Sequence, residues 1–245
     1  TATFTATAGF SGTGSVTVGT AWQDAAGNTG VGGSDTVAVD TLNPTVAINI
    51  VTTDDIINAA EAGSVITGTN ETGATVALTI GVNTRTATVT GTTWSYTLVA
   101  ADITAMGEGA ETITATATDA AGNTASATRD ITVDTVNPTV AITAIEGGNN
   151  TINAAEAAGG ITVSGTAEIG ATLTVNGVTV TVDGSGNWTT SAASAGEGAL
   201  VITAVATDAA GNTATATRNL TVDTVAPAAG TLSFSNLTDT GSSAT

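Results

Sequence analysis

A six-residue pattern recurs three times in this chain and limits the folds that the chain can adopt. The pattern Asp-Ala-Ala-Gly-Asn-Thr begins at Asp24, Asp119 and Asp208, and each copy is followed by a Val-Asp-Thr segment that leads to a proline. Asp119 and Asp208 are 89 residues apart, and Trp94 and Trp188 are 94 residues apart. The repeats of solenoid proteins are shorter, at roughly 20–50 residues. The spacing therefore predicts whole small domains in a tandem array.

The stretches between these turns have the alternation that is typical of β-strands. Thr alternates with Val, Ile and Ala, and β-branched side chains suit a pleated surface with one buried face. A domain of about 100 residues with several short strands has the size of an immunoglobulin-like sandwich. Aromatic residues make up only 3% of the chain, so each core must be light. We expect an all-β fold, with tandem immunoglobulin-like antiparallel β-sandwich domains in an extended rod.

Three prolines divide the chain into segments. Pro44, Pro138 and Pro227 follow the repeated Val-Asp-Thr segments and should make short, stiff linkers, because proline fixes its own φ angle. The expected segments are residues 1–40, the C-terminal part of a domain; 45–134 and 139–223, two complete domains; and 227–245, the first strands of a further domain. The expected strands are Thr1–Thr7, Ser15–Thr20 and Asp35–Asp40; Val46–Val51, Val65–Thr69, Thr75–Ile80, Arg85–Val89, Trp94–Leu98, Thr112–Thr118 and Ser126–Asp134; Val140–Ile145, Ile161–Thr166, Thr172–Asn176, Val178–Asp183, Trp188–Ser191, Val201–Thr207 and Ala214–Asp223; and Thr231–Ser235.

The charge balance excludes several classes of function. The net charge is −18, and the only cationic side chains are those of Arg85, Arg129 and Arg218. Nucleic acid and anionic lipid are excluded as partners, because phosphate binding needs Lys or Arg to replace counterions. The chain contains no Cys, His or Lys that could act as a base or nucleophile, so we expect no enzymatic activity. We find no signal peptide and no apolar run long enough to cross a bilayer, so no direct membrane insertion is expected.

The carboxylates gather at the predicted ends of the domains. In a seven-stranded antiparallel domain, the loops after the first and fifth strands share one end with the outgoing linker, and the loops after the second and sixth strands share the other. Carboxylates of successive domains should then meet at a linker, where they repel one another unless a cation is bound. Calcium fits best, because it takes about six to eight oxygen ligands in irregular geometry, whereas zinc favours His and Cys. The expected calcium ligands are Glu61, Glu108, Asp134, Glu168 and Asp208 at the junction of the two complete domains, Asp40, Glu71 and Asp119 at the preceding junction, and Glu156, Glu197 and Asp223 at the following one.

Simpler roles are open for some polar residues. The Asp of each repeated turn can cap the turn by hydrogen bonding, while Gly and Asn supply positive φ angles. Asn123 and Asn212 are explained equally well as turn residues only, and acidic loops can be solvated without a metal. For Arg129 and Arg218, we expect pairing with a nearby acid at the surface.

Two other classes of function are weighed beside a structural role. The first is a module that binds a carbohydrate or a host-surface group, and an exposed Trp94 or Trp188 would favour it; we expect both to be core residues. The second is self-association, in which strands of one subunit complete the partial end domain of another by strand addition.

Three stretches of the chain resemble a known family. The segments ITATATDAAGNTASATRDITVDTVNP, GTAEIGATLTVNG and INAAEA resemble the bacterial Ig-like repeats of giant secreted adhesins, of the biofilm-associated and RTX type. The resemblance implies an extracellular stalk on the bacterial cell surface, secreted by a type I system, with calcium stiffening the junctions between neighbouring repeats. It also implies that the modules that mediate adhesion lie elsewhere. Residues 1–40 approach their turn differently, through Gly-Thr-Ala-Trp22-Gln, which suggests a second repeat subtype.

Overall fold

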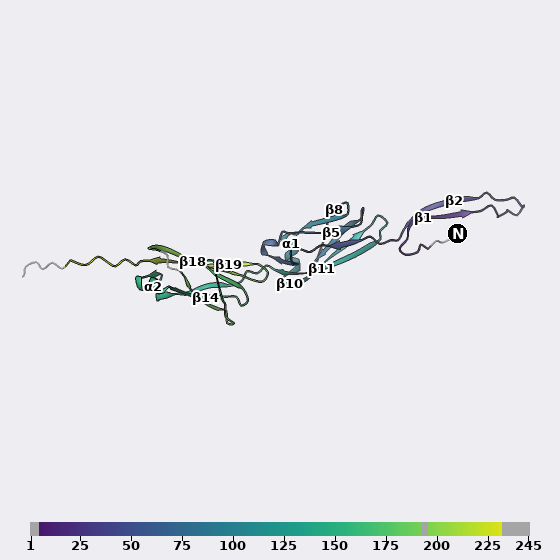
Figure 1. Ribbon diagram of the computed structural model, residues 1–245. Coiled ribbons are helices and arrows are strands. Elements are labelled where there is room, and N and C mark those ends of the chain that lie inside the picture. The colour runs from purple at the N-terminus through teal and green to yellow at the C-terminus, as the bar shows by residue number, and fades with distance from the viewer. Residues whose placement is uncertain (1–4, 193–195, 232–245) are drawn as a thin grey trace, which may run out of the picture. The chain divides into compact units, whose positions relative to one another are not determined.

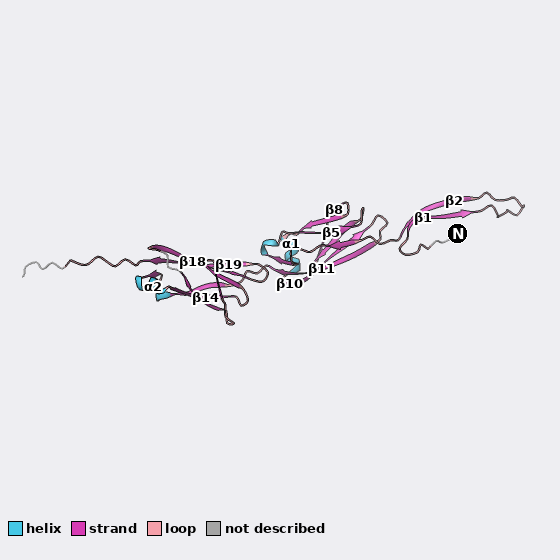
Figure 2. Ribbon diagram, in the orientation of Figure 1, coloured by secondary structure: helices cyan, strands magenta, loops and turns pink. Residues whose placement is uncertain are grey.

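A computed structural model describes residues 5–192 and 196–231 of the 245-residue chain (Figure 1). These residues form many short strands and a few short helices (Figure 2). The chain divides into two compact units. The first unit runs to Asn137 and includes the turn Thr207–Thr213, and the second unit takes Pro138–Ala206 and the segment from Ala214 onwards.

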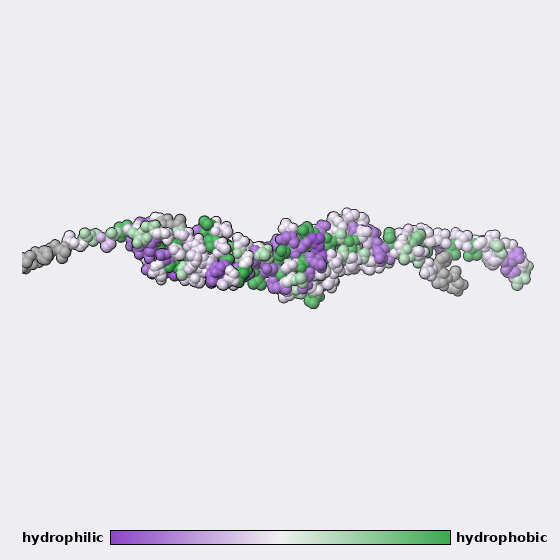
Figure 3. Space-filling model, turned by 60° about the horizontal axis from the view of Figure 1, so that its bottom comes forward, coloured by the Kyte–Doolittle hydropathy of each residue, from purple (hydrophilic) through white to green (hydrophobic). Residues whose placement is uncertain are grey.

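The first unit begins with a hairpin of two antiparallel strands. Strand β1 (Ser11–Val18) pairs with β2 (Gly33–Asp40), from Ser11 opposite Asp40 to Val18 opposite Gly33. Phe10 and Val37 keep 42% and 61% of their surface exposed, and apolar atoms lie along the hairpin in Figure 3. A strand was expected at Thr1–Thr7. Residues 5–7 have no strand structure, so the prediction is wrong for them, and residues 1–4 lie outside the described residues.

The rest of the first unit contains a sandwich of two sheets. One sheet has the order β4-β11-β10-β6-β7 and the other has the order β3-β5-β9-β8. Their bounds are β3 (Val46–Ile48), β4 (Ile56–Asn58), β5 (Val65–Asn70), β6 (Thr75–Ile80), β7 (Asn83–Thr86), β8 (Thr88–Thr90), β9 (Thr93–Thr97), β10 (Gly109–Thr118) and β11 (Thr124–Asp134).

The described residues of the second unit repeat this arrangement with one strand fewer. One sheet has the order β13-β19-β18-β15-β16 and the other has the order β12-β14-β17. Their bounds are β12 (Val140–Ile145), β13 (Thr151–Ile152), β14 (Ile161–Ala167), β15 (Thr172–Val175), β16 (Val178–Val180), β17 (Asn187–Ala192), β18 (Gly198–Thr207) and β19 (Thr213–Val222).

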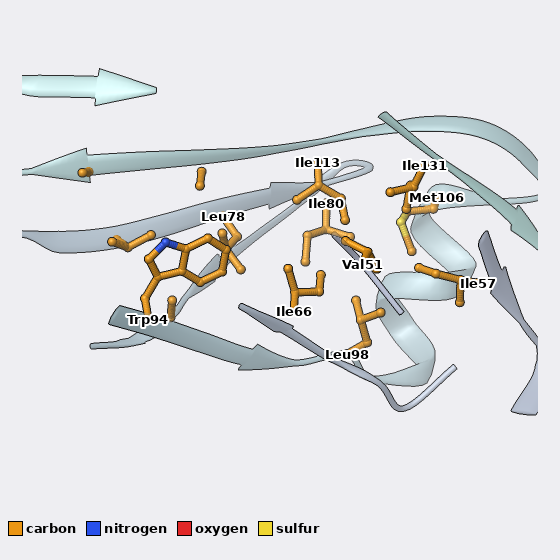
Figure 4. Packing of buried hydrophobic residues seen from close by; sticks show 14 of the residues in the cluster. Val51, Ile57, Ile66, Leu78, Ile80, Trp94, Leu98, Met106, Ile113 and Ile131 are labelled. Atoms are coloured by element: carbon orange, nitrogen blue, oxygen red, sulfur yellow. The ribbon is translucent and has the colours of Figure 1, made fainter. Parts of the chain in front are cut away.

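Alternation along the strands produces the core of each sandwich. In β10, Ile113, Ala115 and Ala117 are buried, while the Thr residues between them keep part of their surface exposed. Trp94 lies next to Leu78, at one end of the labelled side chains in the core of the first sandwich (Figure 4). Trp94 and Trp188 are each 2% exposed, which confirms both as core residues.

Each tryptophan packs on a glycine of the neighbouring strand. Gly68 pairs with Trp94, and a Cβ atom at Gly68 would stand 2.4 Å from the indole and 2.0 Å from the Ala47 oxygen. Gly165 has the same relation to Trp188, with the nearest ring atom 2.6 Å from a Cβ. Only glycine leaves room for the ring at these two positions.

The all-β immunoglobulin-like sandwich fold is confirmed, but several details differ from the sequence-based expectation, among them the strand expected at Val46–Val51, which ends at Ile48. Arg85–Val89 is not one strand, because the chain changes sheets at Ala87 between β7 and β8. The strand expected at Val178–Asp183 ends at Val180. Two α-helices occur where none was expected, α1 (Ala100–Met106) and α2 (Ala154–Gly159). Strands β4 and β13 run parallel to the last strand of their sandwich, so the pairing is not wholly antiparallel.

Candidate functional site

The repeated Asp-Ala-Ala-Gly-Asn turns share one hydrogen-bonding pattern. Asp119 Oδ1 accepts from the backbone N–H groups of Ala121 (2.9 Å) and Asn123 (2.8 Å), and Asn123 Nδ2 donates to Asp119 Oδ2 (2.8 Å). The turn from Asp24 has the same three bonds within 0.1 Å. The glycine of each turn has a φ near +90°, which suits glycine. The aspartates therefore do cap turns, as the simpler explanation expects.

The hydrogen bonds within these turns affect the acidity of their aspartates. The side-chain amide of Asn123 holds the pKa of Asp119 below its ordinary value, and that of Asn28 does the same to the pKa of Asp24. Hydrogen bonds to the ionised carboxylate favour its charged form, even at the surface. The ionised form of these two carboxylates is therefore favoured.

Asn212 makes further bonds within the first unit. Its Nδ2 donates to the backbone oxygen of Asp134 (2.8 Å), and its Oδ1 accepts from the backbone N–H of Ala59 (2.8 Å). The same Nδ2 also lies 3.4 Å from Asp134 Oδ1 and 3.0 Å from Asp208 Oδ2. Asn212 is only 4% exposed, so these bonds satisfy an amide that is nearly lost to solvent. Asn212 is therefore more than a turn residue, because it also bonds to residues outside its own turn.

The residues that receive this turn are held by a short helix, η1 (Ala59–Glu61). Asn58 caps it, because Asn58 Oδ1 accepts from the N–H groups of Ala60 and Glu61 while the Glu61 carboxylate accepts from Asn58 N–H. This reciprocal capping box fixes the Asn58 side chain. Asn58 Nδ2 is then left to donate to the Ala210 oxygen at 3.0 Å.

The three copies of the turn differ in what their asparagine contacts. Asn123 Nδ2 donates to the Asp40 oxygen at 3.2 Å and is half-buried. Asn28 is exposed, and its side-chain amide donates a hydrogen bond to Asp24 of its own turn. Burial of the asparagine thus increases with the number of its partners, from Asn28 to Asn123 to Asn212.

The acidic residues expected to bind calcium are engaged mainly with nearby backbone N–H groups. Glu108 accepts from Thr135 N–H at 2.9 Å and from the Thr135 hydroxyl, and these two bonds lower the pKa of Glu108. The other expected ligands are placed as follows: Asp40, Asp134 and Asp223 accept from the N–H two residues on; Glu61 and Glu156 close capping boxes; Glu168 accepts from Thr139 N–H; Glu197 accepts from Thr224; Asp119 and Asp208 cap their turns; and the backbone oxygen of Glu71 accepts from Ala74 N–H.

The structure brings two of these carboxylates together. Asp134 and Asp208 accept from the same amide nitrogen, that of Asn212. Across residues 5–192 and 196–231, no group of three or more acidic side chains is close enough to hold a metal ion by itself. A cation at this place would need backbone oxygens or water to complete its coordination.

A buried carboxylate that sequence reasoning missed holds helix α1 in place. Asp102 is fully buried and accepts from Arg85 Nε (2.7 Å), Tyr96 Oη (2.7 Å), Asn83 Nδ2 (3.2 Å) and Val99 N–H (3.2 Å). Burial alone raises the pKa of Asp102, but the bonds from Tyr96 and Arg85 outweigh it and hold the pKa below its ordinary value. Arg85 is one of only two cationic residues between residues 45 and 134, and this was the available clue to a carboxylate partner.

The other two arginines hold the loop that precedes the parallel strand. Arg129 donates to both carboxylate oxygens of Asp55, with Nε 2.8 Å from Oδ1, which confirms the expected pairing with an acid. Arg218 donates instead to Asn150 Oδ1 at 2.9 Å, so the expectation of an acidic partner is wrong for Arg218. Asn150 occupies the loop position that corresponds to Asp55.

Each of the two sandwiches has a repeated turn between its last two strands, and their topology is that of an immunoglobulin-like fold. Residues 46–135 match the family model of the bacterial Ig-like domain. A Ca²⁺-stabilised adhesin that helps an Antarctic bacterium reach out and bind ice is 37% identical over 82% of this chain, which spans 55% of that chain, with a TM-score of 0.44. A 1.5-MDa bacterial ice-binding adhesin is 32% identical over 87% of this chain and 74% of the other, with a TM-score of 0.43.

An isolated domain gives a further comparison. A bacterial immunoglobulin-like domain from the M. primoryensis ice-binding adhesin is 33% identical over 38% of this chain and 98% of its own length, with a TM-score of 0.26. A search of curated proteins found no match. From the family model and the sequence identities, this chain belongs to the bacterial Ig-like domains found in adhesins. No helix among the described residues has the length and apolar character needed to cross a membrane.

Proposed function

We propose that this chain is a structural stalk segment of a bacterial cell-surface adhesin and that calcium at its interdomain junctions stiffens it. The observation that carries the proposal is the shared contact of Asp134 and Asp208 with one amide nitrogen. The ion pairs among the described residues use the carboxylates of Asp102 and Asp55. Neither Asp134 nor Asp208 is therefore neutralised by an arginine. Two adjacent negative charges without a cationic side chain favour binding of a cation.

The donor atoms at this place fit calcium. Asp134 and Asp208 supply carboxylate oxygens, Glu61 and Glu108 lie on neighbouring elements of the same unit, and backbone oxygens are close by. Calcium accepts such mixtures of carboxylate, carbonyl and water oxygens. When bound, it would neutralise the carboxylates and remove their mutual repulsion. The equivalent carboxylates at the other two expected junctions are proposed as ligands for the same reason.

The comparisons support the structural role. The first of the similar adhesins is described as Ca²⁺-stabilised and as a means of reaching out, which suits a stalk. We propose by analogy that the parent protein is secreted to the bacterial surface, where its repeats support adhesion or biofilm formation. The buried indoles of Trp94 and Trp188 count against the alternative of a carbohydrate-binding module.

The experiment measures the melting temperature and the small-angle scattering profile in excess calcium and then with a chelator. A ligand at 100 times its Kd stabilises the folded state by about 2.7 kcal/mol, so chelation should lower the melting temperature by several degrees and increase flexibility. The variant Asp208→Asn keeps the oxygen that caps the turn but removes the charge, and it should lose at least half of the calcium effect. Asp130→Asn, an exposed change on β11, is the charge-matched control. Equal melting curves with calcium and chelator would overturn the proposal.

A further inference from the structure

One surface of the first unit binds a repeated turn through hydrogen bonds between protein groups. We call this surface the turn receptor; it consists of the Asn58 side chain, the backbone N–H of Ala59 and the backbone oxygen of Asp134. It makes three hydrogen bonds of 2.8–3.0 Å to Ala210 and Asn212. All three bonds are made by amide groups, so the receptor recognises the shape and the asparagine of the turn.

The second unit carries the same receptor atoms in the same local structure. Asn153 caps α2 as Asn58 caps η1: its Oδ1 accepts from Ala155 and Glu156, and Glu156 accepts from Asn153 N–H at 2.9 Å. The backbone angles of the two caps agree, with φ/ψ of −85°/175° at Asn153 and −90°/177° at Asn58.

The third receptor group is also repeated. In the first unit, β4 runs parallel to β11 and sets Asn58 beside Asp134. In the second unit, β13 runs parallel to β19 with Ile152 beside Val222, and Asp223 N–H donates to the Ile152 oxygen at 2.9 Å. Continuing this register by one residue places Asn153 beside Asp223, as Asn58 lies beside Asp134. Asn153, Ala154 and Asp223 are all exposed, and within the described part of the chain the bonds recorded for the Asn153 side chain are those of the cap.

The hairpin of the first unit presents a turn that fits this second receptor. Residues Asp24–Asn28 have the sequence of Asp208–Asn212, and their internal bonds match: Asn28 N–H donates to Asp24 Oδ1 at 2.9 Å, against 2.8 Å in the later turn. Asn28 is exposed, whereas Asn212 is buried in its receptor.

We infer that Asn153, Ala154 and Asp223 form a receptor for an Asp-x-x-Gly-Asn turn and that the turn Asp24–Asn28 of a second copy of this chain occupies it. Turn and receptor lie in different units of one chain, so the contact uses different patches on each partner. Such a heterologous contact extends head to tail and does not close into a symmetric dimer. All of the hydrogen bonds in this contact join protein groups, so its test in the presence of a chelator is separate from the test of the function proposed above.

Electrostatics determines the conditions for the test. Each copy carries a net charge of −18, so two copies repel one another at low salt. Salt at about 1 M shortens the screening length to about 3 Å and weakens this repulsion. Few bonds hold the turn, so association should be weak and should appear at high protein concentration.

The experiment follows the sedimentation of the full chain between micromolar and millimolar concentration in 1 M NaCl with a chelator. The wild-type average mass should rise progressively with concentration. Asn28→Ala removes the inserted amide, and Asn153→Asp keeps the oxygen that caps α2 but removes the Nδ2 donor; each variant alone should stay monomeric. Asn219→Ala, another exposed asparagine, is the matched control and should behave like the wild type.

Mixing the two inactive variants gives the sharper result. The Asn153→Asp chain retains a working turn and the Asn28→Ala chain retains a working receptor, so an equal mixture should form pairs and no longer species. In a labelled Asn28→Ala chain, the backbone N–H resonance of Ala154 should shift when the Asn153→Asp chain is added. A wild type that stays monomeric at millimolar concentration overturns the inference. So does an Asn28→Ala chain that associates like the wild type, because strand addition along the hairpin would then be the cause.

Discussion

Gly68 lies directly against the indole ring of Trp94 on the neighbouring strand. A Cβ atom at Gly68 would come within 2.4 Å of the ring, and Gly165 stands in the same relation to Trp188 at 2.6 Å. The close approach lets Trp94 Nε1 donate to the Ala47 and Thr69 oxygens at 3.1 and 3.2 Å. A large aromatic side chain therefore fits a core that is otherwise built from small aliphatic groups.

The first prediction concerns this contact. Gly68→Ala should lower the free energy of unfolding of the first sandwich by about 2–3 kcal/mol, because the added methyl group overlaps both the ring and a backbone oxygen. Denaturant unfolding followed by Trp fluorescence measures the change. Gly63→Ala is the control, since a Cβ there meets nothing within 4 Å. Equal losses in the two variants would contradict the packing explanation.

The second prediction concerns the buried carboxylate. Asp102→Asn should destabilise the first sandwich by about 2–3 kcal/mol, because it leaves the Arg85 guanidinium without its charged partner. This figure is below the usual cost for a fully buried pair, because the Arg85 side chain is 31% exposed. Thermal unfolding measures the loss, and Asp130→Asn is the control on an exposed strand position.

The same carboxylate predicts a dependence on pH. The folded-state pKa of Asp102 lies below its ordinary value, so its contribution to stability is present above about pH 4 and is lost as the pH falls through the folded-state pKa. The difference in melting temperature between the wild type and Asp102→Asn should therefore shrink as the pH is lowered from 5 towards 2. A difference that stays constant over this range would assign the effect to packing.

The fourth prediction separates two roles of Asn58. Asn58→Ala should cost about 1 kcal/mol through loss of the helix cap and should also release the Ala210 contact. Asn58→Asp keeps the capping oxygen but cannot donate to the Ala210 oxygen. It should therefore preserve the amide protection of Glu61 while shifting the resonances of Ala210 and Gly211. Unchanged turn resonances in both variants would show that Asn58 acts as a cap only.

The fifth prediction compares two equivalent arginines. Arg129 pairs with a carboxylate, whereas Arg218 pairs with the neutral Asn150. Arg129→Ala should cost up to about 1 kcal/mol at low salt and less at 1 M NaCl, because salt screens a partly exposed ion pair. The cost of Arg218→Ala should be nearly the same at both salt concentrations. Urea unfolding at two salt concentrations measures both; equal salt dependence would contradict the assigned partners.

The sequence by itself determined the class of fold and the position of most strands. Alternating Thr and Val or Ala in stretches such as Ala115–Thr118 decides which face is buried, and Asp-Ala-Ala-Gly-Asn can form its turn from local hydrogen bonds alone. Sequence also identified Trp94 and Trp188 as core residues, because a light core has no other place for so large a side chain.

Only the tertiary structure decided which polar groups meet. The bonds from Asn212 to Ala59 and Asp134 join residues 153 and 78 positions apart, and the spacing along the chain does not specify them. The same holds for Asp102, whose helix α1 has a weak sequence pattern and is stabilised by Arg85 and Tyr96 from other elements. Strand patterns arise from local backbone and side-chain preferences, whereas these contacts depend on how separate loops converge once the sheets are packed.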